Sequence, residues 1–317
     1  MTIDVGPLAL DAGQEADRIA SAIRMQVTSL QRRGVVLGLS GGIDSSVAAA
    51  LAVRGLGADR VLGLLMPERE SAPESLALGH QFGQHLGIRT IVEDVTAILD
   101  GAGCYKRRDA AIRSVVPEYG EGYKSKIVLS AAPRGPYRMF NIVAEALDGR
   151  RTEVRLTADA SRAIVAATNF KQRARKMIEY HYADRYQYAV VGTPNRLEYD
   201  QGFFVKNGDG AADLKPLAHL YKTQVYQLAE YLEIPVDIRR RRPTTDTFPL
   251  EQSQEEFYFS VPLAALDHCL HGLDNAVPAA VVAARVRLTP EHVEGIYRDI
   301  EAKRRTTAYL HAPAIVL

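Results

Sequence analysis

A short buried strand that breaks at two glycines and restarts as a helix constrains this chain more than any other feature. The stretch "VVLGLSGGIDSSVAAALA" begins with residues 35–39, which suit a strand buried on both faces of a parallel sheet. Alanine and leucine dominate residues 47–53, which predicts a helix. Between them, Gly41 and Gly42 let the backbone turn tightly and bring its N–H groups close to a ligand. The pattern therefore predicts an anion site at a helix N-terminus, suited to a phosphate or pyrophosphate.

The loop itself, residues 40–46, differs from one known nucleotide loop and resembles another. No lysine follows the glycines, so the chain lacks the G-x-x-x-x-G-K-[ST] loop of kinases and GTPases. The pattern S-G-G-x-D-S after a strand is similar to the pyrophosphate loop of the ATP pyrophosphatase group, enzymes that cleave ATP between its α and β phosphates. The structural alternative is an ordinary glycine turn in which Asp44 caps the helix. Strand, double glycine, aspartate, paired serines and helix occur in order, which favours the nucleotide loop.

Composition excludes several other classes. The 317 residues carry a net charge of +1, so the overall charge attracts neither nucleic acid nor a membrane, and 47% hydrophobic residues suffice for a substantial core. No apolar stretch is long enough to span a bilayer and the start lacks a secretory pattern, so we expect a cytoplasmic protein. Cys104 and Cys269 lie far apart, which argues against a C-x-x-C zinc site and against the sulfur-transferring tRNA enzymes of the group.

Strands and helices alternate through much of the chain. Buried strands are predicted in "VVLGL", "RVLGLLMP", "IRTIVEDV" and "QYAVVGT", and helices in residues 16–33, "SAPESLALGHQFGQHLG" and "NFKQRARKMIEYHYADRY". This spacing indicates βαβ units and hence an α/β fold, a doubly wound parallel sheet of the Rossmann-like ATP pyrophosphatase type. We expect this domain to comprise residues 1–100 and 168–275, with its ligand beyond the carboxyl ends of the strands.

Residues 101–167 break that alternation. Four segments, "YKSKIVLSA", "YRMFNIVAEAL", "TEVRLTA" and "RAIVAAT", alternate like half-buried strands, and "LDGRR" supplies an Asp-Gly turn suited to a hairpin. The sequence therefore predicts a small β-rich insertion that serves as a lid, an interface or structural filler. In the C-terminal tail, residues 276–317, "TPEHVEGIYRDIEAKRRT" predicts a capped amphipathic helix that packs on the domain or on a second subunit.

Polar residues also follow the strand "AVV". Because that strand ends just before Thr193, Asn195 and Glu198 are expected at the carboxyl edge of the sheet, near the phosphate loop. Carboxylate oxygens of Glu198 and Asp44 suit a hard cation such as Mg²⁺, which neutralises a leaving pyrophosphate. These residues would form the second half of one site.

A glycine-rich turn, "KNGDGAAD", carries Lys206, Asp209 and Asp213. Such a density of charge is unusual in a purely structural connection. A solvent-exposed surface turn is the alternative, because Gly- and Asx-rich turns are common.

Two basic runs leave alternatives open. Lys171, Arg173 and Arg175 alternate along a predicted helix and cannot share one face, whereas Arg173 and Lys176 can; a solvated basic face is the alternative for most of them. The run "IRRRRP", Arg239–Arg242, is interpreted first as a solvated charge run and second as a phosphate site for a small ligand. Nucleic-acid binding is the least favoured interpretation.

Five blocks together resemble the NAD synthetase family. They are "LSGGIDSS", "NFKQRARKM", "VVGTPNRLE", "GFFVKNGDGAADLKPLAHLYKTQVYQLA" and "PTTDTFPLEQSQEEFYFSVPLAALDHCLHG". In the family's order they look like the phosphate loop, an interface helix, a Mg²⁺-binding turn, a second nucleotide loop and a late mobile loop. The block "GFFVKNGDGAADLKPL" is the most specific, because other ATP pyrophosphatases share the first loop but not this one. The resemblance covers about half of the chain, residues 33–99 and 169–272.

The resemblance implies an ATP-dependent ligase. A carboxylate oxygen of deamido-NAD attacks the α-phosphate of ATP, giving an acyl-adenylate and pyrophosphate, and ammonia then displaces AMP. The family's ATP contacts carry over to Ser40, Gly41, Gly42, Asp44, Ser45, Thr193 and Lys206. Its catalytic charges carry over to Asp44, Lys206 and Lys222, its substrate contacts to Arg173, Asp209 and Asp213, and its Mg²⁺ ligands to Asp44 and Glu198. Catalysis would rest on positioning and electrostatic stabilisation, without a side-chain nucleophile.

Partners and substrate identity stay open at this point. The resemblance implies a homodimer, and free ammonia or a separate partner would supply nitrogen, because the chain has no room for an amidase domain before the phosphate loop. The insertion is longer than the family's usual linker and the late loop, "TFPLEQSQEEFYFSVP", is altered. An amide ligase of the same fold acting on another carboxylate is therefore one alternative. A catalytically idle nucleotide-binding protein is another, against which the intact Asp44, Glu198 and Lys206 argue.

Overall fold

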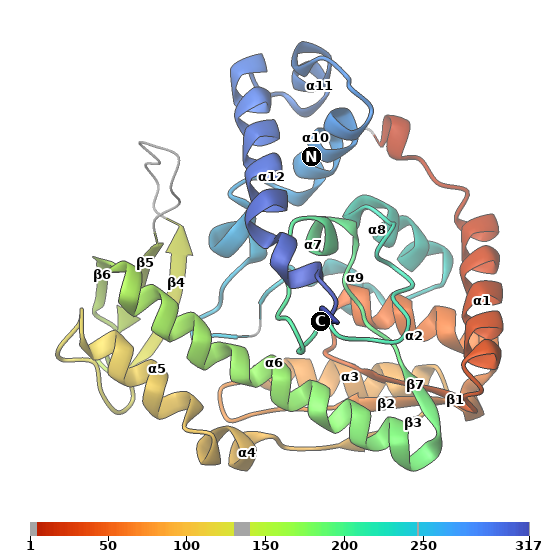
Figure 1. The fold of residues 1–317 in the computed structure, drawn as a ribbon, viewed down its shortest axis with the longest axis horizontal. Coiled ribbons are helices and arrows are strands. Elements are labelled where there is room, and N and C mark those ends of the chain that lie inside the picture. Colours follow the sequence, from red (N-terminus) through yellow and green to blue (C-terminus); the bar gives the residue numbers. More distant parts are fainter. Residues whose placement is uncertain (1–4, 130–139, 246, 317) are drawn as a thin grey trace.

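A four-stranded parallel sheet organises the fold (Figure 1). The computed structural model describes residues 5–129, 140–245 and 247–316. The strands lie in the order β3-β2-β1-β7: β3 (Arg89–Val92), β2 (Val61–Leu65), β1 (Gly34–Gly38) and β7 (Tyr188–Val190). Val35 of β1 pairs in parallel with Val61 on one side and Ala189 on the other. The chain winds outward from β1 to β3 and then returns to the far side of β1, which confirms the predicted doubly wound sheet.

Helices cover both faces of this sheet. On one face lie α1 (Ala12–Ser29), α2 (Ile43–Leu56), α3 (Pro73–His85) and α8 (Lys222–Tyr231), and on the other α4 (Thr96–Gly101), α5 (Cys104–Arg113) and α6 (Ala158–Tyr186). Side chains of β1 alternate between the two cores: Val35 and Leu37 pack against the first set of helices and Val36 against the second. Burial on both faces explains why the strand is apolar at every position.

A three-stranded antiparallel sheet lies in the segment expected to be β-rich. Its strands, in order, are β4 (Lys124–Leu129), β5 (Phe140–Glu145) and β6 (Arg151–Arg155). The Asp-Gly turn between β5 and β6 is confirmed: Gly149 has φ +80°, and the N–H of Ala146 donates to the carbonyl of Arg150 at 2.9 Å. Ile127 and Ile142 belong to a core that this sheet shares with α5 and α6.

The fourth predicted strand of that segment, "RAIVAAT", is wrong, because these residues are helical. They belong to α6, which Thr157 caps by accepting the N–H of Ala160 at 3.1 Å. The β-branched Ile164 favours a strand, but the buried positions Ala160, Ile164 and Ala167 recur at helical spacing. The start of the segment is helical as well, since α5 precedes β4.

Helix α6 contacts both sheets. Its 29 residues form a core with the antiparallel sheet near the N-terminal end and with the parallel sheet near the C-terminal end. Figure 1 shows the helix running from one sheet to the other. The helix begins about three turns before residue 169, where the sequence placed its start. It is therefore continuous across residue 168, the predicted boundary between the insertion and the parallel domain.

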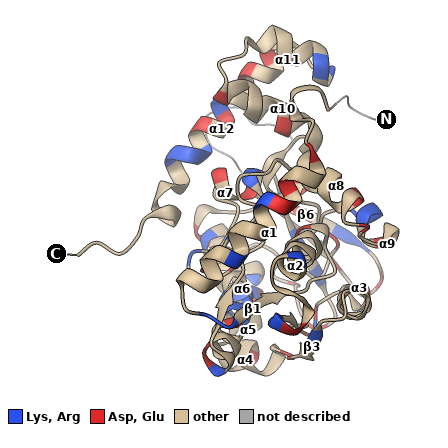
Figure 2. Ribbon diagram, turned by 90° about the vertical axis from the view of Figure 1, so that its right-hand side faces the viewer, with Lys and Arg blue, Asp and Glu red and all other residues tan. Residues whose placement is uncertain are grey.

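The remaining helices follow β7 in the chain. They are α7 (Arg196–Asp200), α9 (Val236–Arg240), a π-helical turn (Glu255–Phe259), α10 (Leu263–Asp274), α11 (Ala279–Val286) and α12 (Pro290–His311), and short 3₁₀ turns lie at Gly6–Leu8 and Ala58–Arg60. The predicted tail helix is α12; Thr289 caps it by accepting the N–H of His292 at 3.3 Å, and it packs on α10 and α11 of this chain. Acidic and basic residues are interspersed along α1 and α12 (Figure 2). Across the described ranges, every helix is too short or too polar to cross a bilayer.

Candidate active site

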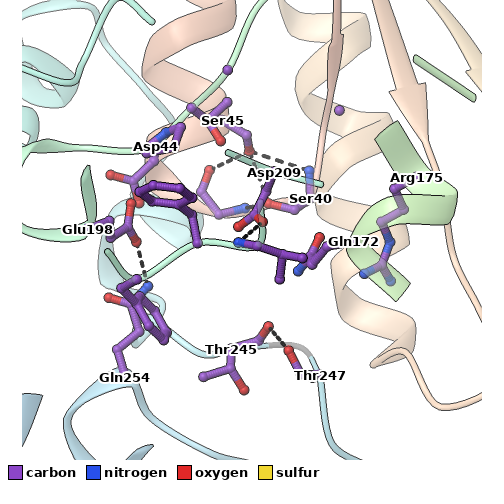
Figure 3. A pocket seen from close by; sticks show the side chains of 18 of the residues that line it. Ser40, Asp44, Ser45, Gln172, Arg175, Glu198, Asp209, Thr245, Thr247 and Gln254 are labelled. Atoms are coloured by element: carbon purple, nitrogen blue, oxygen red, sulfur yellow. Dashed lines mark hydrogen bonds between the residues drawn. The ribbon is translucent and has the colours of Figure 1, made fainter. Parts of the chain in front are cut away.

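The carboxyl ends of β1 and β7 open into one cavity of about 750 Å³. It lies where the winding of the chain reverses, the usual ligand position in such sheets. Ser40 lines it from the loop after β1, Asp44 from the first turn of α2, and Thr193 from the loop after β7. Helix α6, the end of α12 and parts of residues 241–245 and 247–258 also line it, and Figure 3 shows Gln172 of α6 and Gln254 around the same pocket. This volume lies within the usual range for ligand pockets, and it suffices for a nucleotide.

The loop after β1 has the backbone geometry of an anion site. Gly41 has φ +70°, and a Cβ there would lie 2.7 Å from the carbonyl oxygen of Ser75, so only glycine fits. The N–H of Gly42 donates to Ser40 Oγ at 3.3 Å, and the hydroxyl oxygens of Ser40 and Ser45 lie 3.2 Å apart. No described side chain caps α2, which leaves its first N–H groups to an anion.

Asp44, in the first turn of α2, is the centre of charge in the site. Its carboxylate accepts hydrogen bonds from the side-chain amide of Asn195 at 3.1 Å and from the ammonium of Lys222. Burial alone would lower the pKa of Lys222, but the negative charges of Asp44 and Glu198 raise it above its usual value. Since Asp44 contacts these two side chains and does not cap α2, the helix-cap alternative is wrong.

Glu198 is the second carboxylate. The N–H of Asn195 donates to one of its oxygens at 3.1 Å, and the amide of Gln254 donates to the other at 2.7 Å. Burial and the negative charge of Asp44 raise the pKa of Glu198 to about 7, which the positive charge of Lys222 opposes. The positive charge of Lys222 therefore does not fully offset the negative charges of Asp44 and Glu198.

Asp44 and Glu198 suit a hard cation, because both offer oxygen ligands and both would gain from added positive charge. Within the described ranges, no three His, Cys, Asp or Glu side chains form a metal-binding group. A Mg²⁺ ion would therefore take its other oxygens from phosphates and water, which is the usual arrangement for this ion.

Arg241 lies against the phosphate loop. Its guanidinium donates to the hydroxyl of Ser75 at 2.7 Å and to the carbonyls of Ser40 and Gly41 at 3.5 and 3.4 Å. Arg239, two residues earlier, bonds the carbonyl of Ile234 at 2.9 Å and does not line the cavity. The arginines of the basic run therefore differ in their surroundings. For Arg241, the second interpretation, a phosphate site for a small ligand, fits better than a solvated charge.

Helix α6 turns part of its basic side toward the cavity. Arg173, Arg175 and Lys176 all line it, and Figure 3 shows Arg175 on this helix. Arg173, the predicted substrate contact, donates to the carbonyl of Lys206 at 3.3 Å. The solvated alternative is wrong for Lys176, which is buried in an ion pair with Glu179.

Lys206 lines the cavity but points its ammonium at the end of α12. It donates to the carbonyls of Tyr309 and Ala312, each at 2.8 Å, and lies 4.1 Å from the centre of the Tyr309 ring. These carbonyls carry the negative end of the helix dipole, which a lysine stabilises. The structure thus places this predicted catalytic lysine in the cavity wall, bound to the tail and not to the phosphate loop.

The two aspartates of the glycine-rich turn have different surroundings. Asp209 lines the cavity and accepts the N–H of Val205 at 2.7 Å, and burial raises its pKa to about 6. Asp213 is absent from the described cavity lining and accepts the N–H of Val190 in β7 at 2.7 Å. Asp213 therefore braces the edge of the sheet, which does not support its predicted contact with substrate.

Several polar residues of the site escaped the sequence analysis. Gln254, Thr245 and Thr247 line the cavity from the late loop, and Figure 3 shows Gln254 reaching Glu198. Isolated amides and hydroxyls in a loop have no periodicity or spacing that would mark them. Only the resemblance of the whole block pointed to this part of the chain.

Comparison with known proteins identifies a family. The NAD synthase family model matches residues 15–111 and 143–307. The NH3-dependent NAD+ synthetase of Rhizobium meliloti (strain 1021) is 56% identical over 305 residues, which cover 96% of this chain and 91% of that protein. The NH3-dependent NAD+ synthetase of Thermotoga maritima is 33% identical over 260 residues, covering 82% and 86%.

Solved structures share the fold. An NMN synthetase from Francisella tularensis has a TM-score of 0.68 and 21% identity, covering 98% of this chain and 99% of that one. An NH3-dependent NAD synthetase from Campylobacter jejuni, in complex with the nitrate ion, has a TM-score of 0.65 and 22% identity, covering 98% and 100%. At these identities the likeness shows the fold alone.

Proposed function

The chain belongs to the NAD synthase family, and we propose that it is an NH3-dependent NAD+ synthetase. In the proposed reaction, a carboxylate oxygen of deamido-NAD attacks the α-phosphate of ATP and releases pyrophosphate. Ammonia then attacks the acyl carbon and releases AMP. One observation carries the proposal: the open N-terminus of α2 shares a cavity with two carboxylates and a buried lysine, in a chain 56% identical to an enzyme of that name.

Each part of the loop after β1 has a distinct task in this reaction. The backbone N–H groups at Ser40–Ser45 and the hydroxyls would bind pyrophosphate, with the dipole of α2 directed at it. Lys222 would hold Asp44 in place and offset charge that develops as pyrophosphate leaves. Thr193 and Arg173 line the same cavity, in positions where they would contact ATP and the second substrate.

The donor set of Asp44 and Glu198 supports a bound Mg²⁺. When bound, the ion would supply positive charge to the leaving pyrophosphate. Glu198 would be held for this task by Asn195 and Gln254, which bond its two oxygens. Asp209, buried beside the same cavity, would orient the second nucleotide.

We further propose that free ammonia is the nitrogen donor and that the protein acts as a homodimer. The first rests on the named activity of the relatives, which is NH3-dependent. The dimer rests on the family resemblance. Light scattering of the purified protein would test the oligomeric state, and a mass of about 35 kDa would contradict the dimer.

The experiment that tests the function follows a labelled oxygen. Purified protein receives ATP, MgCl2, NH4Cl and deamido-NAD labelled with ¹⁸O in the carboxylate. Attack of that oxygen on the α-phosphate leaves one ¹⁸O in AMP once ammonia has displaced it. We expect NAD, AMP and pyrophosphate in equal amounts, with label in AMP. Unlabelled AMP would overturn the adenylation step.

A parallel reaction with nicotinic acid mononucleotide distinguishes the main alternative, an amide ligase acting on another carboxylate. AMP formation with that acid and not with deamido-NAD would overturn the assigned substrate while keeping the chemistry. A protein that binds ATP but turns over neither acid would be the idle nucleotide-binding protein. Asp44→Asn serves as the inactive control in each reaction.

A further inference from the structure

Part of the antiparallel sheet lies in the segment that the family model skips, residues 112–142. This segment includes β4 and the start of β5. Its neighbour in space is the late loop, residues 243–245 and 247–257, which lines the cavity from the side opposite the phosphate loop (Figure 3). The contacts between the sheet and the late loop indicate the role of the sheet.

Residues 125–127 of strand β4 bind the late loop. The N–H of Leu250 donates to the carbonyl of Ser125 at 3.3 Å, and the side-chain amide of Gln252 donates to the carbonyl of Ile127. From the strand, Lys126 reaches the carbonyl of Glu251 at 3.1 Å and the carboxylate of Glu256 at 3.2 Å. Three successive residues of the loop, 250–252, and Glu256 are therefore tied to one edge of the sheet.

Apolar side chains reinforce the contact. Phe248 and Phe257 of the late loop belong to the same core as Ile127 and Ile142 of the sheet. Phe140 of β5 lies against Phe257, with ring centres 6.2 Å apart, and both line the cavity. The sheet and the loop thus share a core and form one wall of the cavity together.

The loop is fixed on its inner side as well. Thr247 offers its carbonyl to the ammonium of Lys171 at 2.8 Å. Lys171 is fully buried, contrary to a solvated basic face, and also pairs with Glu68 and Glu70 at 2.8 Å. From this fixed loop, Gln254 donates to Glu198 in the site. A continuous set of contacts joins β4 to a carboxylate of the active site.

We propose that the antiparallel sheet holds the late loop in its site-lining position before any substrate binds, and that Lys126 and Gln252 are the positioning residues through which it does so. A loop that is already ordered does not lose conformational freedom when substrate binds, so affinity improves. The consequence for catalysis rests on the proposed function. The ordering of the loop does not, because it concerns the protein alone.

Hydrogen exchange of the substrate-free protein tests the ordering directly. Lys126→Ala and Gln252→Ala each remove a link from loop to sheet. Each should speed amide exchange in residues 247–256 about tenfold, because the loss of one hydrogen bond lowers the free energy of local opening by about 1 kcal/mol. Lys126→Arg keeps the charge and reach and should restore slow exchange. Arg151→Ala is the matched control, since Arg151 pairs with Glu145 on the same sheet, at 2.7 Å, and no bond to the late loop is described for it.

Steady-state kinetics give the second readout. Both alanine variants should raise KM for deamido-NAD roughly fivefold with kcat within about twofold, because the lost order is restored at the expense of binding. Unchanged exchange in both variants, or equal acceleration in Arg151→Ala, would overturn the inference. If exchange accelerates while wild-type protein makes no NAD, the proposed function falls and the ordering of the loop stands.

Discussion

The ammonium of Lys222 lies against the carboxylate of Asp44, 178 positions away in the sequence, and this pair joins the N-termini of α2 and α8 in the wall of the cavity. The Lys222 side chain is 2% exposed and that of Asp44 18%. A buried ion pair of this kind is costly to break, because the remaining charge has lost its partner.

Replacing Lys222 by methionine should therefore lower both stability and activity. We expect a loss of about 3–5 kcal/mol in the free energy of unfolding and a fall in kcat of about 10²- to 10³-fold. Denaturant unfolding and NAD formation measure the two effects. The double variant Asp44→Asn/Lys222→Met should lose less stability than the sum of the single variants. A strictly additive result would contradict the coupling of the pair.

Gly41 and Gly57 form a matched pair of glycines. Both have positive φ, +70° and +85°, but a Cβ meets the carbonyl of Ser75 at 2.7 Å only at Gly41, whereas nothing lies within 4 Å at Gly57. Gly57→Ala should cost about 1–3 kcal/mol for the backbone conformation alone, because φ +85° with ψ 153° is a region that glycine adopts almost exclusively, and Gly41→Ala should cost more. Only Gly41→Ala should weaken ATP binding, measured by calorimetry. Equal ATP affinity in the two variants would contradict the assigned phosphate loop.

Variants of Arg241 and Arg239 distinguish the two interpretations of the basic run, a phosphate site and a solvated charge run. Arg241 contacts the phosphate loop, whereas Arg239 bonds a backbone carbonyl away from the cavity. Arg241→Ala should lower kcat/KM for ATP about 10- to 100-fold, as expected for loss of a charged contact worth about 1.5–3 kcal/mol. Arg239→Ala should leave the value within about twofold. A similar loss in both variants would point to the run as a whole acting by long-range charge.

Asp267 of α10 fixes the start of α8, and with it Lys222. Its two carboxylate oxygens accept the N–H groups of Lys222 and Thr223 at 3.1 and 2.7 Å. Burial raises its pKa from the usual 3.8 to about 7, despite these hydrogen bonds. The folded protein therefore binds this proton more tightly than the unfolded chain does.

The free energy of unfolding should therefore fall as pH rises. The contribution of Asp267 to stability is full below about pH 4 and is lost as pH rises toward 7, by at most about 1.4 kcal/mol per pH unit. Asp267→Asn should flatten the decline in stability between pH 4 and 7, measured by urea unfolding at several pH values. An unchanged slope would show that other buried carboxyls, such as Asp209, dominate the decline.

The sequence predicted the parts of the fold that depend on local pattern. The strand-loop-helix at residues 35–53 and the parallel order of strands follow from apolar runs and glycines, which act over a few residues. The helical nature of "RAIVAAT" escaped, because Ile164 and its β-branched neighbour favour a strand locally while packing in α6 decides otherwise. Packing of this kind involves partners distant in sequence.

In the site, too, local pattern predicted some residues, whereas contacts between distant residues were not predicted. Asp44 and Glu198 were predicted, since each lies within a few residues of the end of a strand and the two strands end at the same edge of the sheet. The partners of Lys206 were not, because Tyr309 and Ala312 are more than a hundred residues away and offer only backbone carbonyls. A carbonyl at a helix end carries no signature in the amino-acid sequence.

The continuity of α6 bears on protein engineering. At 29 residues the helix is about 43 Å long, and its first turns support one sheet while its last turns support the other. A chimaera that joins residues 101–167 to a relative without this sheet would cut the helix and separate Ile164 from Phe248, which shares its core. A successful transplant would have to carry all of α6 together with Phe248 and Phe257, so the antiparallel sheet is not an exchangeable module.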